Sequence, residues 1–325
     1  MRYEIRLRPG GRVGKQSLLD SELGLSPLGL GTVEMGIPYG IGKPPPPPDE
    51  ECISLLHHAV ESGINYIDTA SLYGRSEEIV GKAFAGIADP PMIATKVNLH
   101  PDNKPEAPRG AQLRTFVEES VQRSLKLLHT NTLDLLQLHN AIDEDLTPEF
   151  LEIMTDLRQR GWVKYLGATT YGEDAPGRIL DLSDHFGILQ VAYNVLDRRL
   201  EKRIFPRSKS LGVGLVVRSV FLQGALSDRA KELPAELTKL RHAVEKVADI
   251  AVGAGISVSE LALRYVAYNP NTYITLFGTT SRDELHANIA AYEQGPLAND
   301  VLNALNAIDK LDDYYVDIGN WIHLI

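Results

Sequence analysis

The sequence is poor in several features on which whole classes of protein depend. Its 325 residues include one cysteine, Cys52, so no disulfide can form within the chain. This argues against a small, disulfide-stabilised secreted domain. No apolar run approaches the roughly 18 residues of a membrane-spanning helix, and the N-terminal segment has no apolar signal-peptide core. We therefore expect a cytoplasmic protein that does not contact membranes.

Basic residues are also in the minority. The chain has 33 Lys and Arg against 43 Asp and Glu, which gives a formal net charge of −10. This balance argues against nucleic acids and anionic membranes as partners. An anionic ligand would need positive groups that are local to its site.

The sequence does contain a regular alternation of short apolar runs with segments of helical periodicity. The runs are apolar almost throughout, as parallel strands buried on both faces are. The predicted strands are residues 27–32, 65–68, 92–96, 133–139, 165–169, 189–193, 214–218 and 273–277. Such an alternation predicts a single (β/α)8 TIM barrel over residues 1–325, a fold that typically takes about 250 residues. A doubly wound sheet fits less well, because no early Gly-x-Gly-x-x-Gly turn follows the first strand.

The predicted helices follow the strands, at residues 50–62, 76–85, 114–128, 147–160, 174–184, 201–211, 258–267 and 282–292. Two connections are long. Residues 33–48 end in five consecutive prolines, a stiff polyproline II spacer. Residues 221–255, after the seventh strand, contain a helical stretch at 234–252 and are expected to form a lid or wall. We expect residues 1–24 to form a hairpin. Residues 293–325 should supply a helix and an aromatic tail that either closes the active-site face or packs on a helix.

Four polar residues stand at the ends of successive predicted strands. Asp68 ends the second strand and Tyr73 follows in the next loop, before Ser76, a predicted helix N-cap. Lys96 lies in the third strand and His139 ends the fourth. In a parallel barrel these ends share one face, where chemistry is carried out. Taken singly, each residue also has an ordinary structural explanation, such as capping or core packing.

These residues carry a resemblance to the aldo-keto reductase family. The pattern Gly-x-x-x-x-Asp-Thr-Ala-x-x-Tyr-Gly-x-Ser-Glu runs from Gly63 to Glu77, and Lys96 and His139 lie where the family places the rest of its catalytic tetrad. The resemblance spans residues 25–292. It implies hydride transfer between a nicotinamide cofactor and an aldehyde or ketone and its alcohol. It also implies a small-molecule substrate, no metal, and a monomer or small homo-oligomer.

The chemistry of the four residues suits that reaction. Tyr73 can exchange a proton with the substrate oxygen, and a nearby Lys96 is expected to lower the phenol pKa from its usual value near 10. Asp68 would keep Lys96 charged, and His139 would orient the carbonyl. A Schiff-base aldolase or lyase that uses Lys96 is an alternative. A nicotinamide-sensing accessory subunit is another.

The resemblance also implies cofactor contacts. At the nicotinamide end, Thr169 and Thr170 replace the family's Ser-Asn pair, and Arg218 replaces a tyrosine that commonly stacks on the ring. The other implied contacts are Gly31, Thr32, Asp68, Gln190 and, in the pyrophosphate loop, Ser219, Phe221, Gln223, Gly224 and Leu226.

At the adenosine end, the resemblance points to Gly278, Thr280, Arg282, Glu284 and Asn288. The resemblance favours NADP(H) as the cofactor, because members of the family commonly use it. Glu284, however, stands where NADP-using members often carry an arginine for the 2′-phosphate, so NAD(H) stays an alternative.

The predicted substrate loops are polar. Glu34, Met35 and Tyr39 follow the first strand, and Asn98 and His100 follow the third. If these residues line the pocket, they favour a hydroxylated, sugar-like carbonyl compound.

Overall fold

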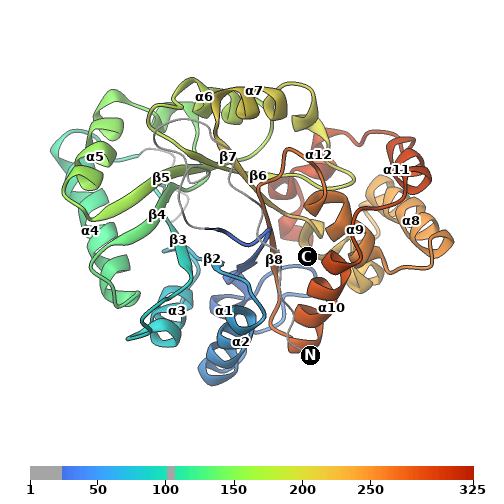
Figure 1. The fold of residues 1–325 in the computed structure, drawn as a ribbon. Coiled ribbons are helices and arrows are strands. Elements are labelled where there is room, and N and C mark those ends of the chain that lie inside the picture. The colour runs from blue at the N-terminus through green and yellow to red at the C-terminus, as the bar shows by residue number, and fades with distance from the viewer. Residues whose placement is uncertain (1–23, 101–106) are drawn as a thin grey trace.

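The strands form a closed parallel barrel. The computed structural model describes residues 24–100 and 107–325, and the predicted hairpin at 1–24 lies outside them except for its last residue. Sequential pairing joins the strands in chain order, and the last strand pairs with the first (Figure 1). The strands are β1 Leu28–Gly31, β2 Tyr66–Asp68, β3 Met92–Val97, β4 Leu133–Leu138, β5 Val163–Thr170, β6 Ile188–Ala192, β7 Gly214–Arg218 and β8 Ile274–Gly278. The predicted TIM barrel is therefore confirmed, with β6 one residue earlier than expected.

The helices lie outside the ring of strands. They are α1 Val33–Gly36, α2 Asp49–Glu61, α3 Ser76–Phe84, α4 Ala111–Leu127, α5 Pro148–Gln159, α6 Asp174–Asp181, α7 Ile204–Leu211, α8 Thr238–Gly253, α9 Val258–Ala267, α10 Arg282–Glu293, α11 Asn299–Asn306 and α12 Asp313–Val316. The short α1 was not predicted, and α6 ends earlier than expected. Pro48, the last of the five prolines, has φ −56° and ψ 149° and leads directly into α2.

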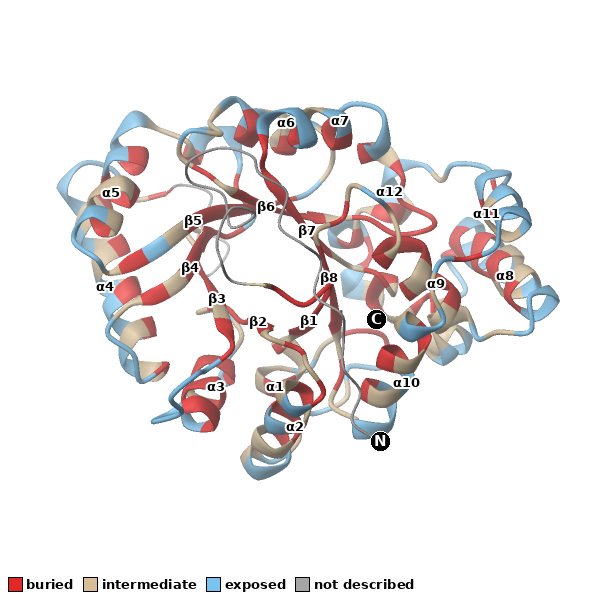
Figure 2. Cartoon of the chain, viewed as in Figure 1, coloured by how far each residue is buried: buried red, intermediate tan, exposed pale blue. Residues whose placement is uncertain are grey.

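Burial divides the apolar residues into two clusters (Figure 2). The larger one fills the space between the strands and the helices. The smaller one fills the barrel interior, where the side chains of Tyr66, Met92, Leu135 and Ile188 come from four strands. Because side chains alternate across a strand, the residue two positions further along each strand also points into the barrel. That next layer carries the polar residues of the site.

The loops after β1 and β7 meet above the barrel. The backbone N–H of Ile41 donates to the carbonyl of Gln223 at 2.9 Å, so residues 33–48 and 221–255 form adjoining walls. The tail packs at the loop after β6, where Arg199 pairs with Asp317 at 2.6 Å, and Trp321 is fully buried. None of the residues that line the cavity described below comes from this tail.

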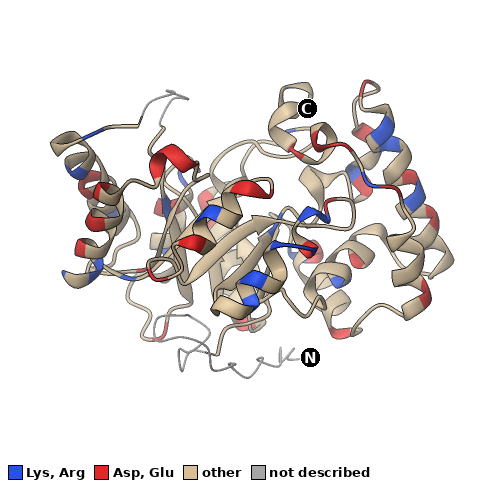
Figure 3. Cartoon of the chain, turned by 90° about the horizontal axis from the view of Figure 1, so that it is seen from above, with Lys and Arg blue, Asp and Glu red and all other residues tan. Residues whose placement is uncertain are grey.

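Charged residues of both signs are spread over the outer helices (Figure 3). In residues 24–100 and 107–325, no single helix is long and apolar enough to cross a membrane. The helices α8 and α9 meet the length and composition criteria only as a pair, and this pair is bent by 92°.

Candidate active site

A buried ion pair lies at the centre of the site. The Nζ of Lys96 donates to Oδ2 of Asp68 at 2.6 Å and to the carbonyl of Thr69 at 2.7 Å. Lys96 is 1% exposed and Asp68 is 4% exposed. Burial lowers the pKa of Lys96, and the charge of Asp68 partly offsets this effect. The predicted pairing of Asp68 with Lys96 is therefore present.

Two glutamine side chains complete this polar layer. Nε2 of Gln190 donates to the other carboxylate oxygen of Asp68 at 2.7 Å, and Nε2 of Gln137 approaches the same oxygen at 3.5 Å. Gln137 pairs in register with Lys96 across β3 and β4. The sequence analysis missed Gln137. The available signal was an amide inside an otherwise apolar strand.

Tyr73 and His139 lie beside the ion pair. The Nζ of Lys96 is 4.9 Å from the centre of the Tyr73 ring, and the His139 ring meets that ring edge-on at 5.8 Å between centroids. The loop of Tyr73 reaches this place through two glycines. A Cβ on Gly36 would lie 1.7 Å from the carbonyl oxygen of Tyr73, and Gly74 has a φ of +56°. The structure thus brings the four predicted catalytic residues together.

Ser76 has a different place from the one predicted. It is the first residue of α3, and Arg75 precedes it as the N-cap. The Ser76 hydroxyl instead bonds to the hydroxyl of Thr32 at 2.6 Å and to that of Thr69 at 2.8 Å. It therefore ties the ends of β1 and β2 together below the loop of Tyr73.

The predicted lowering of the Tyr73 pKa is wrong. Burial raises the pKa of Tyr73, the charge of Asp68 raises it further, and Arg218 opposes them only in part. Burial is the largest cause, and the charge of Lys96, which was expected to lower the pKa, is already matched by Asp68. Burial, together with the charges of Lys96 and Arg218, holds the pKa of His139 well below 6.5. At neutral pH Tyr73 is therefore protonated and His139 is neutral.

A cavity of about 350 Å³ starts at Asp68 and Tyr73 and reaches Asn288 on α10. The residues of the cofactor prediction that line it are Gly31, Thr32, Asp68, Gln190, Arg218, Ser219, Phe221, Gln223, Gly224, Gly278, Glu284 and Asn288. Its size falls in the range of small-molecule sites, roughly 300–1,000 Å³.

The other predicted cofactor residues lie outside the cavity wall: Thr169, Thr170, Leu226, Thr280 and Arg282. The Thr169 hydroxyl accepts from the backbone N–H of Asn140 at 2.8 Å. Leu226 is fully buried in the apolar core, and Arg282 donates to the Ser54 hydroxyl on α2.

Acidic residues gather at the far end of the cavity. Burial raises the pKa of Glu34, the positive charge of Arg229 lowers it, and the nearby Glu284 raises it. The Glu284 carboxylate also accepts from the hydroxyl of Thr279. Arg229, which was not among the residues predicted from the sequence, is therefore the positive charge that acts on Glu34 at this end of the cavity. It lies in a single 3-10 turn, Asp228–Glu232, within the long connection after β7, and this turn is too short to show a helical periodicity in the sequence.

The wall after β7 shows features of a dinucleotide site. Ser219, Leu222 and Gln223 have positive φ values of 61°, 45° and 60°. Such conformations are costly for residues other than glycine and cluster at ligand clamps. Both polar atoms of the Gln223 side chain are buried without a partner. These observations fit an extended polar ligand along this wall.

The residues predicted to line a substrate pocket divide into two groups. Glu34 and Tyr39 line the cavity. Met35 is fully buried, Asn98 accepts from the backbone of His100, and the ring of His100 contacts Asp145 at 2.7 Å. Asn98 and His100 are therefore not among the residues that line the cavity.

Comparisons with known proteins agree with this geometry. The sequence model of the Aldo/keto reductase family matches residues 27–310. Aldo-keto reductase YhdN of Bacillus subtilis is 30% identical over 295 residues, which cover 83% of this chain and 86% of that protein. The oxidoreductase YqkF of the same organism is 28% identical over 316 residues, 92% of this chain and 98% of that protein.

Solved structures give the same result. The holo form of aldo-keto reductase AKR11C1 from Bacillus halodurans superposes with a TM-score of 0.74 at 27% identity, covering 94% of this chain and all 100% of that one. The glycerol dehydrogenase AKR11B4 from Gluconobacter oxydans, at 24% identity over 95% of this chain and 97% of that one, shares the fold with a TM-score of 0.72. The chain is therefore a nicotinamide-dependent oxidoreductase that belongs to the aldo/keto reductase family.

Proposed function

We propose that this protein moves hydride between a nicotinamide cofactor and the carbonyl of a small polar substrate, with Tyr73 as the general acid and base. One observation carries the proposal. The Tyr73 phenol lies against the buried pair of Lys96 and Asp68 at one end of a long cavity. A proton donor at one end of a cavity that extends from Tyr73 to Asn288 suits reduction with a dinucleotide cofactor.

The residues divide the work of proton transfer. Because its pKa is raised, Tyr73 holds its proton at neutral pH and can donate it to the carbonyl oxygen. As the proton leaves, the Lys96 ammonium stabilises the phenolate. A neutral His139 can donate one hydrogen bond to the same oxygen and so orient the carbonyl. Asp68 holds Lys96 in place throughout.

The bound cofactor would supply the hydride, and three features would hold it. The Oε1 of Gln190 can accept from the carboxamide, because its Nε2 already donates to Asp68. The loop from Ser219 to Gly224 lines the middle of the cavity, and Asn288 lines its far end. Family resemblance favours NADP(H), whereas the carboxylates of Glu34 and Glu284 favour NAD(H) because they repel a 2′-phosphate. Calorimetric titration with both cofactors decides between them.

The proposed substrate is a polar, hydroxylated carbonyl compound. Tyr39 and Arg218 line the cavity beside Tyr73 and offer polar groups to a substrate there. An assay with a panel of aldoses, hydroxyaldehydes and apolar aldehydes tests the idea by the loss of reduced-cofactor absorbance. Faster turnover of apolar than of hydroxylated aldehydes would contradict it.

The geometry argues against the Schiff-base alternative. The Lys96 nitrogen is fully buried and donates to both Asp68 and Thr69. As an ammonium paired with the Asp68 carboxylate, this nitrogen has no lone pair for attack on a carbonyl. Borohydride treatment in the presence of carbonyl compounds should leave Lys96 unmodified. A substrate adduct on Lys96, detected by mass spectrometry, would favour the aldolase. Tight cofactor binding with no turnover of any carbonyl would favour an accessory subunit.

A further inference from the structure

Arg218 ends β7, and its charge acts on the catalytic residues. Its side chain is half-buried and lines the cavity together with Asp68 and Tyr73. Its charge reaches the tetrad. Burial is the largest cause of both pKa shifts, since it raises the pKa of Tyr73 and lowers that of His139. Arg218 is among the groups that lower both pKa values. The guanidinium is therefore at the reacting end of the cavity.

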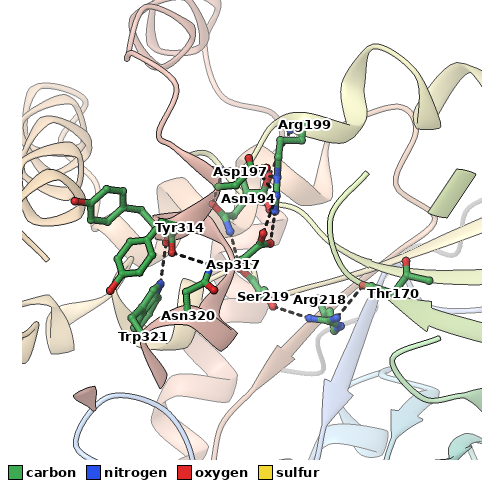
Figure 4. Close-up of polar contacts among 12 residues, drawn as sticks. Thr170, Asn194, Asp197, Arg199, Arg218, Ser219, Tyr314, Asp317, Asn320 and Trp321 are labelled. Atoms are coloured by element: carbon green, nitrogen blue, oxygen red, sulfur yellow. Dashed lines mark hydrogen bonds and ion pairs between the residues drawn. The ribbon is translucent and has the colours of Figure 1, made fainter. Parts of the chain in front are cut away.

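The protein holds the guanidinium in a fixed position (Figure 4). One terminal nitrogen donates to the carbonyl of Thr170 at 3.0 Å, and the other donates to the Ser219 hydroxyl at 3.2 Å. The guanidinium carbon lies 3.9 Å from the centre of the Tyr171 ring. The carbonyl of Ser219 accepts in turn from Asn194 at 3.1 Å. Only part of the donor capacity is used, since a guanidinium carries five N–H groups.

Arg218 has no acidic partner among residues 24–100 and 107–325. Arg199, also drawn in Figure 4, is a contrast, because it pairs with Asp197 at 2.8 Å and with Asp317 at 2.6 Å. The acceptors of Arg218 are a carbonyl and a hydroxyl, so its charge is not neutralised within the described residues. A partly desolvated charge of this kind favours an anion from outside the chain.

The position of Arg218 identifies which ligand carries that anion. The other arginine in the cavity wall, Arg229, acts on Glu34, which the charge of Glu284 also reaches. Arg218 instead shares its surroundings with three phenols, those of Tyr39, Tyr73 and Tyr171. An anion bound here would lie next to the carbonyl that Tyr73 protonates. Because Tyr73 protonates the substrate carbonyl, an anionic group carried by the substrate can reach this place.

We propose that Arg218 binds an anionic group of the substrate, so that the preferred carbonyl compounds are oxo acids. This inference rests on the proposed function and adds that the substrate carries a negative charge. Planar carboxylates suit the guanidinium best, because they can accept two parallel N–H bonds. Tyr171 and Thr170 act as positioning residues that hold the guanidinium toward the cavity.

A matched pair of aldehydes tests the proposal. The value of kcat/KM is measured for para-formylbenzoate and for its neutral methyl ester, with the wild type and with Arg218→Gln, Arg218→Lys and Arg203→Gln. Arg203 pairs with Asp174 on the outer surface, so its variant removes the same charge far from the cavity. Glyceraldehyde phosphate against glyceraldehyde forms a second pair, which distinguishes a phosphate from a carboxylate preference. Cofactor affinity and melting temperature are measured for every variant.

The wild type and Arg203→Gln should favour the acid over the ester by at least ~tenfold, and Arg218→Gln should lose this preference. Arg218→Lys should keep part of it, and cofactor affinity should change less than about twofold. Equal rates with acid and ester in the wild type would overturn the proposal. A matching fall for both aldehydes, together with weaker cofactor binding in Arg218→Gln, would also overturn it, because Arg218 would then serve the cofactor.

A binding measurement distinguishes a failure of this inference from a failure of the proposed function. Calorimetry with saturating oxidised cofactor compares para-hydroxymethylbenzoate with its methyl ester. Tighter binding of the acid, lost in Arg218→Gln, supports the anion site even if no aldehyde is turned over. Turnover of neutral aldehydes without any such difference in binding supports the reductase and removes the anion site.

Discussion

Two adjacent layers of the barrel interior have opposite chemistry. In the lower layer, Tyr66 on β2 and Leu135 on β4 are fully buried in an apolar cluster. Two residues further along the same strands, Asp68 and Gln137 are just as buried but belong to the polar network around Lys96. One step of the strand repeat thus separates packing from chemistry. The lower layer fixes the strands, and the upper layer uses that rigidity to hold a charge pair in place.

The largest effect should come from removing the hydroxyl of Tyr73. We expect Tyr73→Phe to lower kcat for carbonyl reduction by about 10²–10⁴, since the proton donor is lost. Cofactor affinity and melting temperature should stay near those of the wild type. Stopped-flow turnover and a cofactor titration provide the check. A variant that binds cofactor and keeps normal turnover would show that the upper layer does not contain the acid.

Breaking the ion pair should cost stability as well as activity. Lys96→Met leaves the Asp68 carboxylate buried without its cation, and we expect the free energy of unfolding to fall by about 3–5 kcal/mol. The double variant Lys96→Met with Asp68→Asn should recover much of this stability but not the turnover. Denaturant unfolding measures the free energy of unfolding of the single and of the double variant. A single variant as stable as the wild type would mean that water or another group already compensates the carboxylate.

Protonation of His139 gives a smaller, pH-dependent effect. Its folded-state pKa is held well below 6.5, so below pH 6.5 the unfolded chain binds a proton that the folded protein does not. Stability from this group is present above pH 6.5 and is lost as the pH falls, by at most about 1.4 kcal/mol per pH unit. The free energy of unfolding of His139→Gln should therefore fall less steeply between pH 7 and pH 5. Identical slopes for both proteins would contradict the assignment.

The smallest effect should come from Tyr66→Phe. It serves as a control for Tyr73→Phe, because it removes the same hydroxyl group from a tyrosine in the lower layer. The Tyr66 hydroxyl is buried without a partner. Tyr66→Phe removes a desolvated polar atom from the lower layer, so we expect the protein to gain about 1 kcal/mol of stability and to keep its turnover. Thermal unfolding and steady-state kinetics test this. A large loss of activity would show that the two layers are not separate in function.

The barrel and the four catalytic candidates could be predicted because they depend on local signals. Near-continuous apolar runs marked the strands, and Asp68 and His139 stood at their ends, which a parallel barrel brings to one face. The partners of these residues could not be predicted in this way. Gln137 meets Asp68 only because β3 and β4 pair in the register that sets Lys96 opposite Gln137, and register is not written in either strand alone.

Electrostatics was the other limit. The pKa of Tyr73 depends on how far the loops after β1 and β7 cover it and on the fact that Asp68 already neutralises Lys96. Both are properties of the assembled structure. The contact of Arg218 with the nicotinamide, which the family resemblance implies, stays a prediction. Only its contacts with Thr170 and Tyr171 show where the guanidinium is held.

A crystal structure with reduced cofactor bound would test the account most directly. The account predicts the nicotinamide carboxamide at Gln190 and the hydride-bearing carbon facing the Tyr73 hydroxyl, with room for a carbonyl carbon about 3–3.5 Å away. A nicotinamide bound elsewhere in the cavity, with Tyr73 out of reach of any carbonyl beside it, would contradict the account.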